Sequence, residues 1–155
     1  MRLVIVRHGR AEEQRPGVSD DERRLTNEGR RDVECIARVL PWRIELVYSS
    51  PLKRAVETAE ILSTVHSAEL RVVNELRPET TSLNVITKLE LRSVTALVGH
   101  APSIEQVLQE LISGGNVKLS AGAAAGIELE AIERGRGVLI YIVTPEMCKK
   151  CLLMQ

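Results

Sequence analysis

Leu3-Val4-Ile5-Val6-Arg7-His8-Gly9 is the stretch of sequence that decides the fold. Its four aliphatic residues form an unbroken apolar run, which is typical of a central parallel strand covered on both faces. The run ends directly in an arginine and a histidine. Ligands of open α/β sheets bind at the carboxyl ends of the strands, so Arg7 and His8 are expected at a binding site.

Two later segments repeat this arrangement, in which an apolar strand gives way to polar residues and then to a helix. Ser49–Ala55 reads SSPLKRA and follows a strand predicted at Leu46–Tyr48. Gly99–Ser103 reads GHAPS and follows a strand predicted at Ala96–Val98. Together the three segments predict an anion site with a histidine at its centre.

Strands and helices alternate along the whole chain. Helices are predicted after the N-cap candidates Thr26, Ser50, Ser82 (reaching Leu91) and Ser103. The remaining strands are predicted at Leu70–Val73, Ile127–Leu129 and Val138–Val143, the last two joined by a turn at Arg134–Gly137. This order predicts one domain over residues 1–155, a three-layer α/β/α sandwich with a mostly parallel central sheet and one antiparallel edge region.

The composition is that of an ordinary globular protein, with 44% hydrophobic and 27% charged residues. The 21 basic and 21 acidic residues cancel to a net charge of +0, which argues against nucleic acid or an anionic membrane as the main partner. No apolar run approaches the roughly 20 residues that a membrane helix needs. The first apolar run is too short for a signal peptide, so a cytoplasmic protein is expected.

Cysteines and histidines are too few to suggest a metal site. The cysteine count of three is odd and does not suggest a disulfide framework, and the lone CxxC of Cys148 and Cys151 lacks the second pair of a zinc site. We therefore expect the cysteines to be incidental. His66 lies at a predicted helix end and is expected at the surface or as a helix C-terminal cation. No metal is therefore expected.

The residues at the strand ends suit phosphoryl transfer, which requires mainly positioning and positive charge around the phosphoryl oxygens. Arg7 and Arg54 each offer a planar fork of donors that matches a phosphate. His8 is the candidate nucleophile, provided that its other ring nitrogen keeps its proton on an acceptor such as a backbone carbonyl of the following loop. His100 could donate to a phosphoryl oxygen if protonated.

Each of these residues also has an ordinary explanation. A single histidine at a strand end is commonly a polar terminus, and an arginine in a first helical turn is commonly a solvated surface charge. Arg54, however, lies at the unfavourable end of the helix dipole, where an anion would account for it. Three such coincidences at successive strand ends favour a shared anion site.

These segments resemble the histidine phosphatase superfamily, which includes the phosphoglycerate mutases. The resemblance rests on the RHG motif of Arg7–Gly9, the Ser-Pro-x-x-Arg stretch that ends at Arg54, the pair Gly99-His100, and Arg23–Gly29, which looks like an R-x-L-T-x-x-G segment. The short length without an inserted cap is similar to the small phosphohistidine phosphatase (SixA-type) branch. The resemblance implies a phosphoglycerate mutase-like fold, His8 as the phosphorylated nucleophile, a phosphate pocket of Arg7, Arg54 and His100, and no cofactor.

The proton donor is where the resemblance weakens. Larger relatives carry an acidic residue after the third strand, and Glu75 lies near that place in the stretch Val73–Pro78. Glu75 is a candidate proton donor, and the alternative is that it orients the loop through Arg77. Arg23 is a candidate for the rim of the pocket, with an ordinary exposed charge as its alternative.

Three functions remain open at this point. The first is a phosphatase of phosphohistidine in a protein such as a phosphorelay domain, because a departing imidazole can carry its own proton and an open pocket suits a side chain of another protein. The second is a phosphatase of small phosphomonoesters, such as sugar or nucleotide phosphates. The third is a phosphate-binding module without catalysis, which would have no use for the nucleophile. A monomer is expected.

Overall fold

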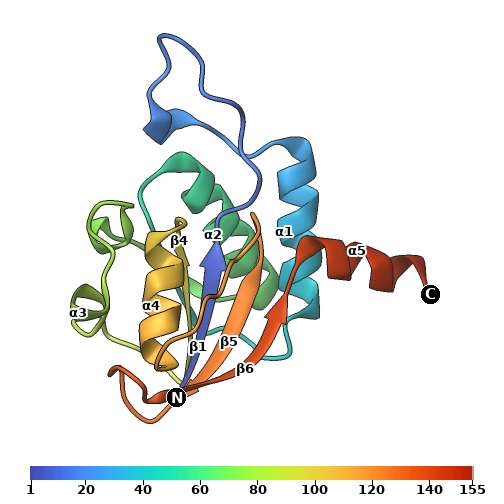
Figure 1. Cartoon of the computed structure of the whole chain (residues 1–155). Coiled ribbons are helices and arrows are strands. Elements are labelled where there is room, and N and C mark those ends of the chain that lie inside the picture. Colours follow the sequence, from blue (N-terminus) through green and yellow to red (C-terminus); the bar gives the residue numbers. More distant parts are fainter. Residues whose placement is uncertain (155) are drawn as a thin grey trace.

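A six-stranded mixed sheet forms the centre of the protein in a computed structural model that describes residues 1–154 (Figure 1). The strands are β1 (Arg2–Arg7), β2 (Leu46–Ser49), β3 (Glu69–Val72), β4 (Val94–Gly99), β5 (Ala124–Leu129) and β6 (Gly137–Val143). Their order is β3-β2-β4-β1-β5-β6. The first four strands pair in parallel, whereas β5 runs antiparallel to both β1 and β6. The predicted sheet with an antiparallel edge is confirmed.

Helices cover both faces of this sheet (Figure 1). They are α1 (Asn27–Val39), α2 (Lys53–His66), α3 (Leu83–Ile86), α4 (Ser103–Leu111) and α5 (Pro145–Leu153), with short 3-10 helices η1 (Asp20–Glu22) and η2 (Asn74–Leu76). Side chains of β1 alternate between two hydrophobic cores. Leu3 and Ile5 pack with residues of α4, whereas Val4 and Val6 pack with residues of α1 and α2. No helix in the described part of the chain is long and apolar enough to cross a membrane.

The helix starts agree only in part with the prediction. Thr26 caps α1 by accepting a hydrogen bond from the Gly29 amide at 2.9 Å, as predicted. Ser50 is not the N-cap, because α2 begins three residues later with Leu52 as its N-cap; the Ser50 hydroxyl contacts His100 and accepts from the Leu52 amide at 3.3 Å. Ser103 lies inside α4 and its hydroxyl donates to the His100 carbonyl at 3.0 Å. The helix after Ser82 ends at Ile86 rather than near Leu91.

Two expectations about isolated residues are wrong. Cys35 of α1 and Cys148 of α5 form a disulfide, so these cysteines are not incidental, although Cys151 is free and exposed. His66 is buried rather than exposed. Its Nδ1 accepts from the Ile44 amide at 3.2 Å and its Nε2 lies 2.9 Å from the Ala37 carbonyl, so the neutral ring links the end of α2 to the end of α1.

Candidate active site

The carboxyl ends of β1, β2 and β4 meet at one edge of the sheet. Arg7 is in register with Gly99 across β1 and β4, and Ser49 is in register with Val98 across β2 and β4. The residues that follow these strands are therefore neighbours, and the rings of His8 and His100 lie 5.0 Å apart. The three segments singled out in the sequence form one site.

His8 is held in a defined orientation by backbone groups. Its Nδ1 lies 2.8 Å from the Gly9 carbonyl oxygen, which can only accept, so Nδ1 carries the proton and Nε2 keeps its lone pair. The Gly9 amide in turn donates to the buried Thr58 hydroxyl at 3.0 Å. A Cβ on Gly9 would lie 2.8 Å from Val33 Cγ2, so this close approach explains the glycine.

Burial and nearby arginines keep the His8 imidazole neutral. Burial lowers the pKa of His8 most, and the positive charges of Arg54, Arg7 and Arg23 lower it further, to about 4. The hydrogen bond to Gly9 opposes this shift. At neutral pH the ring is therefore in the form that can attack phosphorus.

Arg54 connects His8 to the loop that precedes α1. Its side chain is only 6% exposed, and its Nε donates toward His8 Nε2 across 3.3 Å. Its Nη1 donates to the Asp20 carbonyl at 2.8 Å, and its Nη2 donates to the Asp20 carboxylate at 3.1 Å. In the resting protein, the guanidinium that was predicted to hold phosphate thus binds a carboxylate of the same chain.

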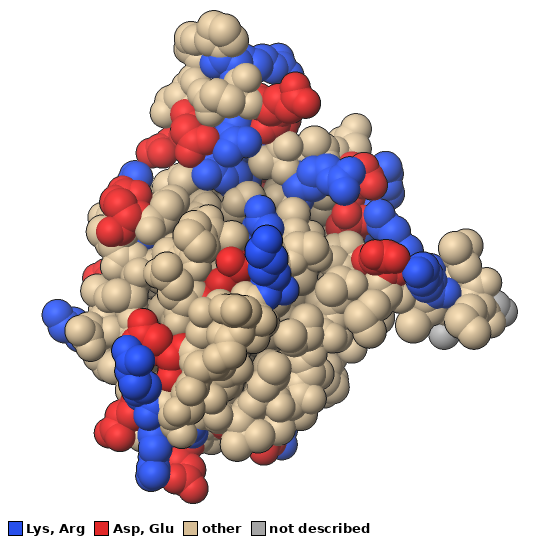
Figure 2. Space-filling view, in the orientation of Figure 1, with Lys and Arg blue, Asp and Glu red and all other residues tan. Residues whose placement is uncertain are grey.

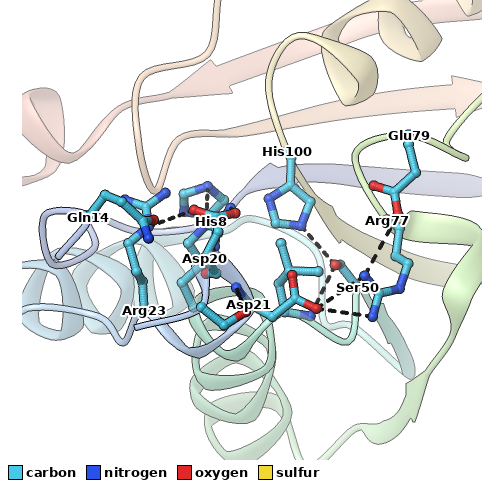
Figure 3. A network of polar contacts seen from close by, with 12 residues as sticks. His8, Gln14, Asp20, Asp21, Arg23, Ser50, Arg77, Glu79 and His100 are labelled. Atoms are coloured by element: carbon cyan, nitrogen blue, oxygen red, sulfur yellow. Dashed lines mark hydrogen bonds and ion pairs between the residues drawn. The ribbon is translucent and has the colours of Figure 1, made fainter. Parts of the chain in front are cut away.

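His100 and Arg7 complete the inner wall of the site. His100 Nε2 lies 2.7 Å from the Ser50 hydroxyl, whereas its Nδ1 is buried with no hydrogen-bond partner among the described residues (Figure 3). Burial lowers the pKa of His100 most, and His8 and Arg54 lower it further, to about 3, so the ring is neutral rather than the protonated donor considered from the sequence. Arg7 donates from Nη1 to the Leu119 carbonyl at 2.8 Å, and its buried Nε has no partner in the described chain.

Asp20 and Ser50 are the site residues that the sequence reasoning did not assign. Asp20 accepts from Arg23 Nε at 2.8 Å as well as from Arg54. Partial burial raises the pKa of Asp20, but the charges and hydrogen bonds of Arg54 and Arg23 outweigh it, so the pKa lies below its ordinary value. The only sequence signal for Asp20 was its place in an acidic run just before Arg23–Gly29. Arg23 lines the cleft, at the place where the rim was predicted.

Glu75 lies in η2, where its side chain is exposed. It is not among the residues that line the cleft around His8. Arg77 contacts Asp21 at 3.3 Å and Glu79 at 3.7 Å instead of Glu75, so the suggested link between Glu75 and Arg77 is not present (Figure 3). The role of Glu75 as a proton donor stays a prediction.

The cleft is open, and basic, acidic and apolar residues line it. Its volume is about 500 Å³, and its lining includes Arg7, His8, Asp20, Arg23, Arg54 and His100. A groove of about 920 Å³ adjoins it and shares Arg7 and Arg10 with it. In the view of Figure 2, basic and acidic side chains lie scattered over the surface among uncharged areas.

Comparisons with known proteins place the chain in a family and a fold. Residues 3–80 match the family model of the histidine phosphatase superfamily (branch 1). A search of curated proteins found no significant match. The protein histidine phosphatase SixA complexed with tungstate is 24% identical, with 99% of each chain covered and a TM-score of 0.81. A protein of Agrobacterium tumefaciens assigned as phosphohistidine phosphatase SixA is also 24% identical, covering 93% of this chain and 98% of that one, with a TM-score of 0.79.

A structure of phosphoserine phosphatase from Entamoeba histolytica with 3-phosphoglyceric acid is more distant. It is 15% identical, covers 94% of this chain and 98% of that one, and has a TM-score of 0.71. At these identities the likeness shows the fold, which is phosphoglycerate mutase-like. The family model spans half of the chain, including Arg7, His8 and Arg54, and on this ground the chain belongs to the histidine phosphatase superfamily.

Proposed function

We propose that this protein is a phosphatase that forms a covalent phosphohistidine on His8, and that its substrate is phosphohistidine in another protein. The orientation of the His8 ring carries the first part of the proposal. Because Nδ1 donates to the Gly9 carbonyl, Nε2 carries no proton, and its lone pair can attack phosphorus once Arg54 Nε, which donates toward it, turns to a phosphoryl oxygen. A merely phosphate-binding site would not require this tautomer.

The surrounding groups suit the charge that develops on a transferred phosphoryl group. Arg54 presents a buried guanidinium beside Nε2. The Nε of Arg7 and the Nδ1 of His100 are buried without a partner among residues 1–154, and a phosphoryl oxygen could pair with them. If the Ser50 hydroxyl donates to His100 Nε2, then Nδ1 carries a proton and can donate in turn. Preorganised donors of this kind supply most of the catalysis in phosphoryl transfer.

The shape of the cleft supports a protein substrate. The cleft continues into the wider groove beside α5, so a side chain presented by another protein can reach His8 while its backbone lies outside. A phosphorylated imidazole departs as a neutral ring when its other nitrogen carries a proton, so it makes a small demand on an acid in the protein. The likeness in fold to SixA proteins is consistent with this substrate.

Small phosphomonoesters are the second candidate. The likeness in fold to a phosphatase solved with 3-phosphoglyceric acid favours them, as does a cleft of about 500 Å³, which has room for a small metabolite. The two candidates share the covalent step on His8 and differ only in the leaving group.

A comparison of substrates tests the proposal. We expect rapid release of phosphate from a histidine-containing protein that has been chemically phosphorylated, slower release from a panel of sugar and nucleotide phosphates, and acid-labile, base-stable phosphate on the enzyme during turnover. His8→Ala should abolish both turnover and labelling, with Glu22→Gln as a control of the same loop region. Efficient turnover of the small esters without any of the phosphoprotein would refute the protein substrate, and labelling of His8→Ala would refute the nucleophile.

A further inference from the structure

Asp20 is the only carboxylate among the described residues that line the cleft around His8. We propose that Asp20 carries the proton for both chemical steps, as general acid when the leaving group departs and as general base when water attacks. The proposal rests on the covalent route through His8 and adds the residue that handles its protons.

The other polar groups of the cleft are unsuited to this task. His8 uses Nε2 as the nucleophile and commits its Nδ1 proton to the Gly9 carbonyl. His100 is neutral and its Nε2 is bonded to Ser50. Arginine does not give up its proton at physiological pH. Asp20 is therefore the group of the cleft that can both hold and release a proton.

The geometry places Asp20 close to the reacting nitrogen. One planar guanidinium contacts both groups, since Arg54 Nε lies 3.3 Å from His8 Nε2 and Arg54 Nη2 lies 3.1 Å from Asp20 Oδ2. Two further contacts hold the short helix η1 that carries Asp20: Arg23 binds its Oδ1 at 2.8 Å, and Arg77 binds the neighbouring Asp21 at 3.3 Å. The Asp20 carboxylate thus lies beside the His8 ring (Figure 3).

Binding of the substrate changes the charge around Asp20. In the resting protein Arg54 and Arg23 keep the carboxyl group ionised. A phosphoryl group bound at His8 Nε2 takes donors of Arg54 and brings negative charge next to Asp20, and both changes favour the protonated carboxyl. The proton can arrive with the substrate, because the second pKa of a phosphate ester is about 6 and part of it is monoanionic near neutral pH.

The two steps then balance as follows. In the first, His8 Nε2 bonds to phosphorus, the bond from phosphorus to the leaving oxygen breaks, and the Asp20 proton passes to that oxygen. In the second, a water oxygen bonds to phosphorus, the bond to Nε2 breaks, and one water proton passes to the Asp20 carboxylate. The alcohol has already left after the first step. Phosphate then departs with the proton that Asp20 took from water, and Arg54 binds the Asp20 carboxylate again.

The benefit of Asp20 in the first step depends on the leaving group. An alkoxide is strongly basic and requires an acid, whereas a nitrophenolate departs readily without one. A phosphohistidine whose other ring nitrogen is protonated leaves as neutral imidazole while Asp20 stays ionised, and one that lacks this proton takes the Asp20 proton at the departing nitrogen, so Asp20 is a carboxylate after either departure. The second step uses Asp20 as base for every substrate, because the phosphoenzyme is the same.

The test compares Asp20→Asn with wild type, Glu22→Gln and Glu75→Gln. Asparagine keeps an oxygen for Arg54, and the Asp20 side chain is 52% exposed, so the fold should be retained, which a melting curve checks. Glu22 lies in the same short helix and loses the same charge. Rapid quenching measures the formation of phosphorylated His8 from nitrophenyl phosphate and from glycerol phosphate, and its decay after the donor is removed.

For Asp20→Asn we expect decay of the phosphoenzyme to slow by about 10²-fold, and formation from the alkyl ester to slow by about 10²–10⁴-fold, with a far smaller effect on the nitrophenyl ester. Glu22→Gln should behave as wild type. Unchanged decay in Asp20→Asn would overturn the proposal, and so would an ester-selective loss in Glu75→Gln alone. Failure of the covalent route itself is distinguishable, because wild type would then carry no acid-labile phosphate on His8.

Discussion

Reduction of the disulfide between Cys35 and Cys148 is expected to destabilise the protein strongly. The bond closes a loop with a sequence separation of 113 residues. In the chain-entropy description a crosslink of this span restricts the unfolded chain by about 5 kcal/mol at 25 °C, and native disulfides contribute about 2–5 kcal/mol when measured. For a chain of this length, that corresponds to a fall in Tm of roughly 5–20 °C.

Urea and thermal unfolding of the oxidised and reduced protein measure this difference. Cys151→Ser provides the background, because it removes the one free thiol while it leaves the bonded pair intact. Cys35→Ser in that background should reproduce the reduced protein without any reductant. Equal unfolding midpoints for the two forms, with the oxidised form verified by its mass, would refute the stabilising role of the bond between α1 and α5.

Two further predictions concern the histidines. Burial and nearby positive charges lower the pKa of His8 to about 4 and that of His100 to about 3, so both rings should stay neutral as the pH falls through 6.5, and His8 should become protonated only near pH 4. NMR titration of the imidazole signals, assigned with His8→Ala and His100→Ala, measures both pKa values. A midpoint near 6.5 for His8 would contradict the prediction. His66→Ala should lower the free energy of unfolding by about 2–4 kcal/mol, because the Ile44 amide and the Ala37 carbonyl lose their buried partner, and urea unfolding measures the loss.

Local patterns in the sequence were enough to predict the sheet and the position of His8 at its edge. The unbroken apolar run of β1 and the polar residues directly after it are features of a single segment, and they placed Arg7 and His8 correctly at a sheet edge. Thr26 was predictable as a cap for the same reason, since its partner lies only three residues away. A feature that depends on residues close together in the sequence can be predicted from a single sequence.

Features that depend on distant residues were not predictable. Ser50 follows a strand and precedes a proline, as an N-cap would, but its hydroxyl binds His100, 50 residues away. Asp20 lies in a segment without periodicity, and only the folded chain brings it to Arg54, 34 residues on. Cys148 meets Cys35 because α5 packs on α1, and no spacing between the two indicates that contact.

In the proposed mechanism, the arginines of the site serve His8 in two ways that cannot be separated. A phosphoryl group requires positive charge to bind, and an imidazole requires an unprotonated nitrogen to attack it. Arg7 and Arg54 lie beside His8, where their charge both attracts the phosphoryl oxygens and disfavours a proton on the ring. Asp20 neutralises part of that charge in the resting protein. On the same proposal, its displacement by the substrate restores the full positive charge of Arg54 when the phosphoryl group is in place. Without this carboxylate, Arg54 would remain a buried cation with no anionic partner between turnovers, a state that is costly in a protein interior.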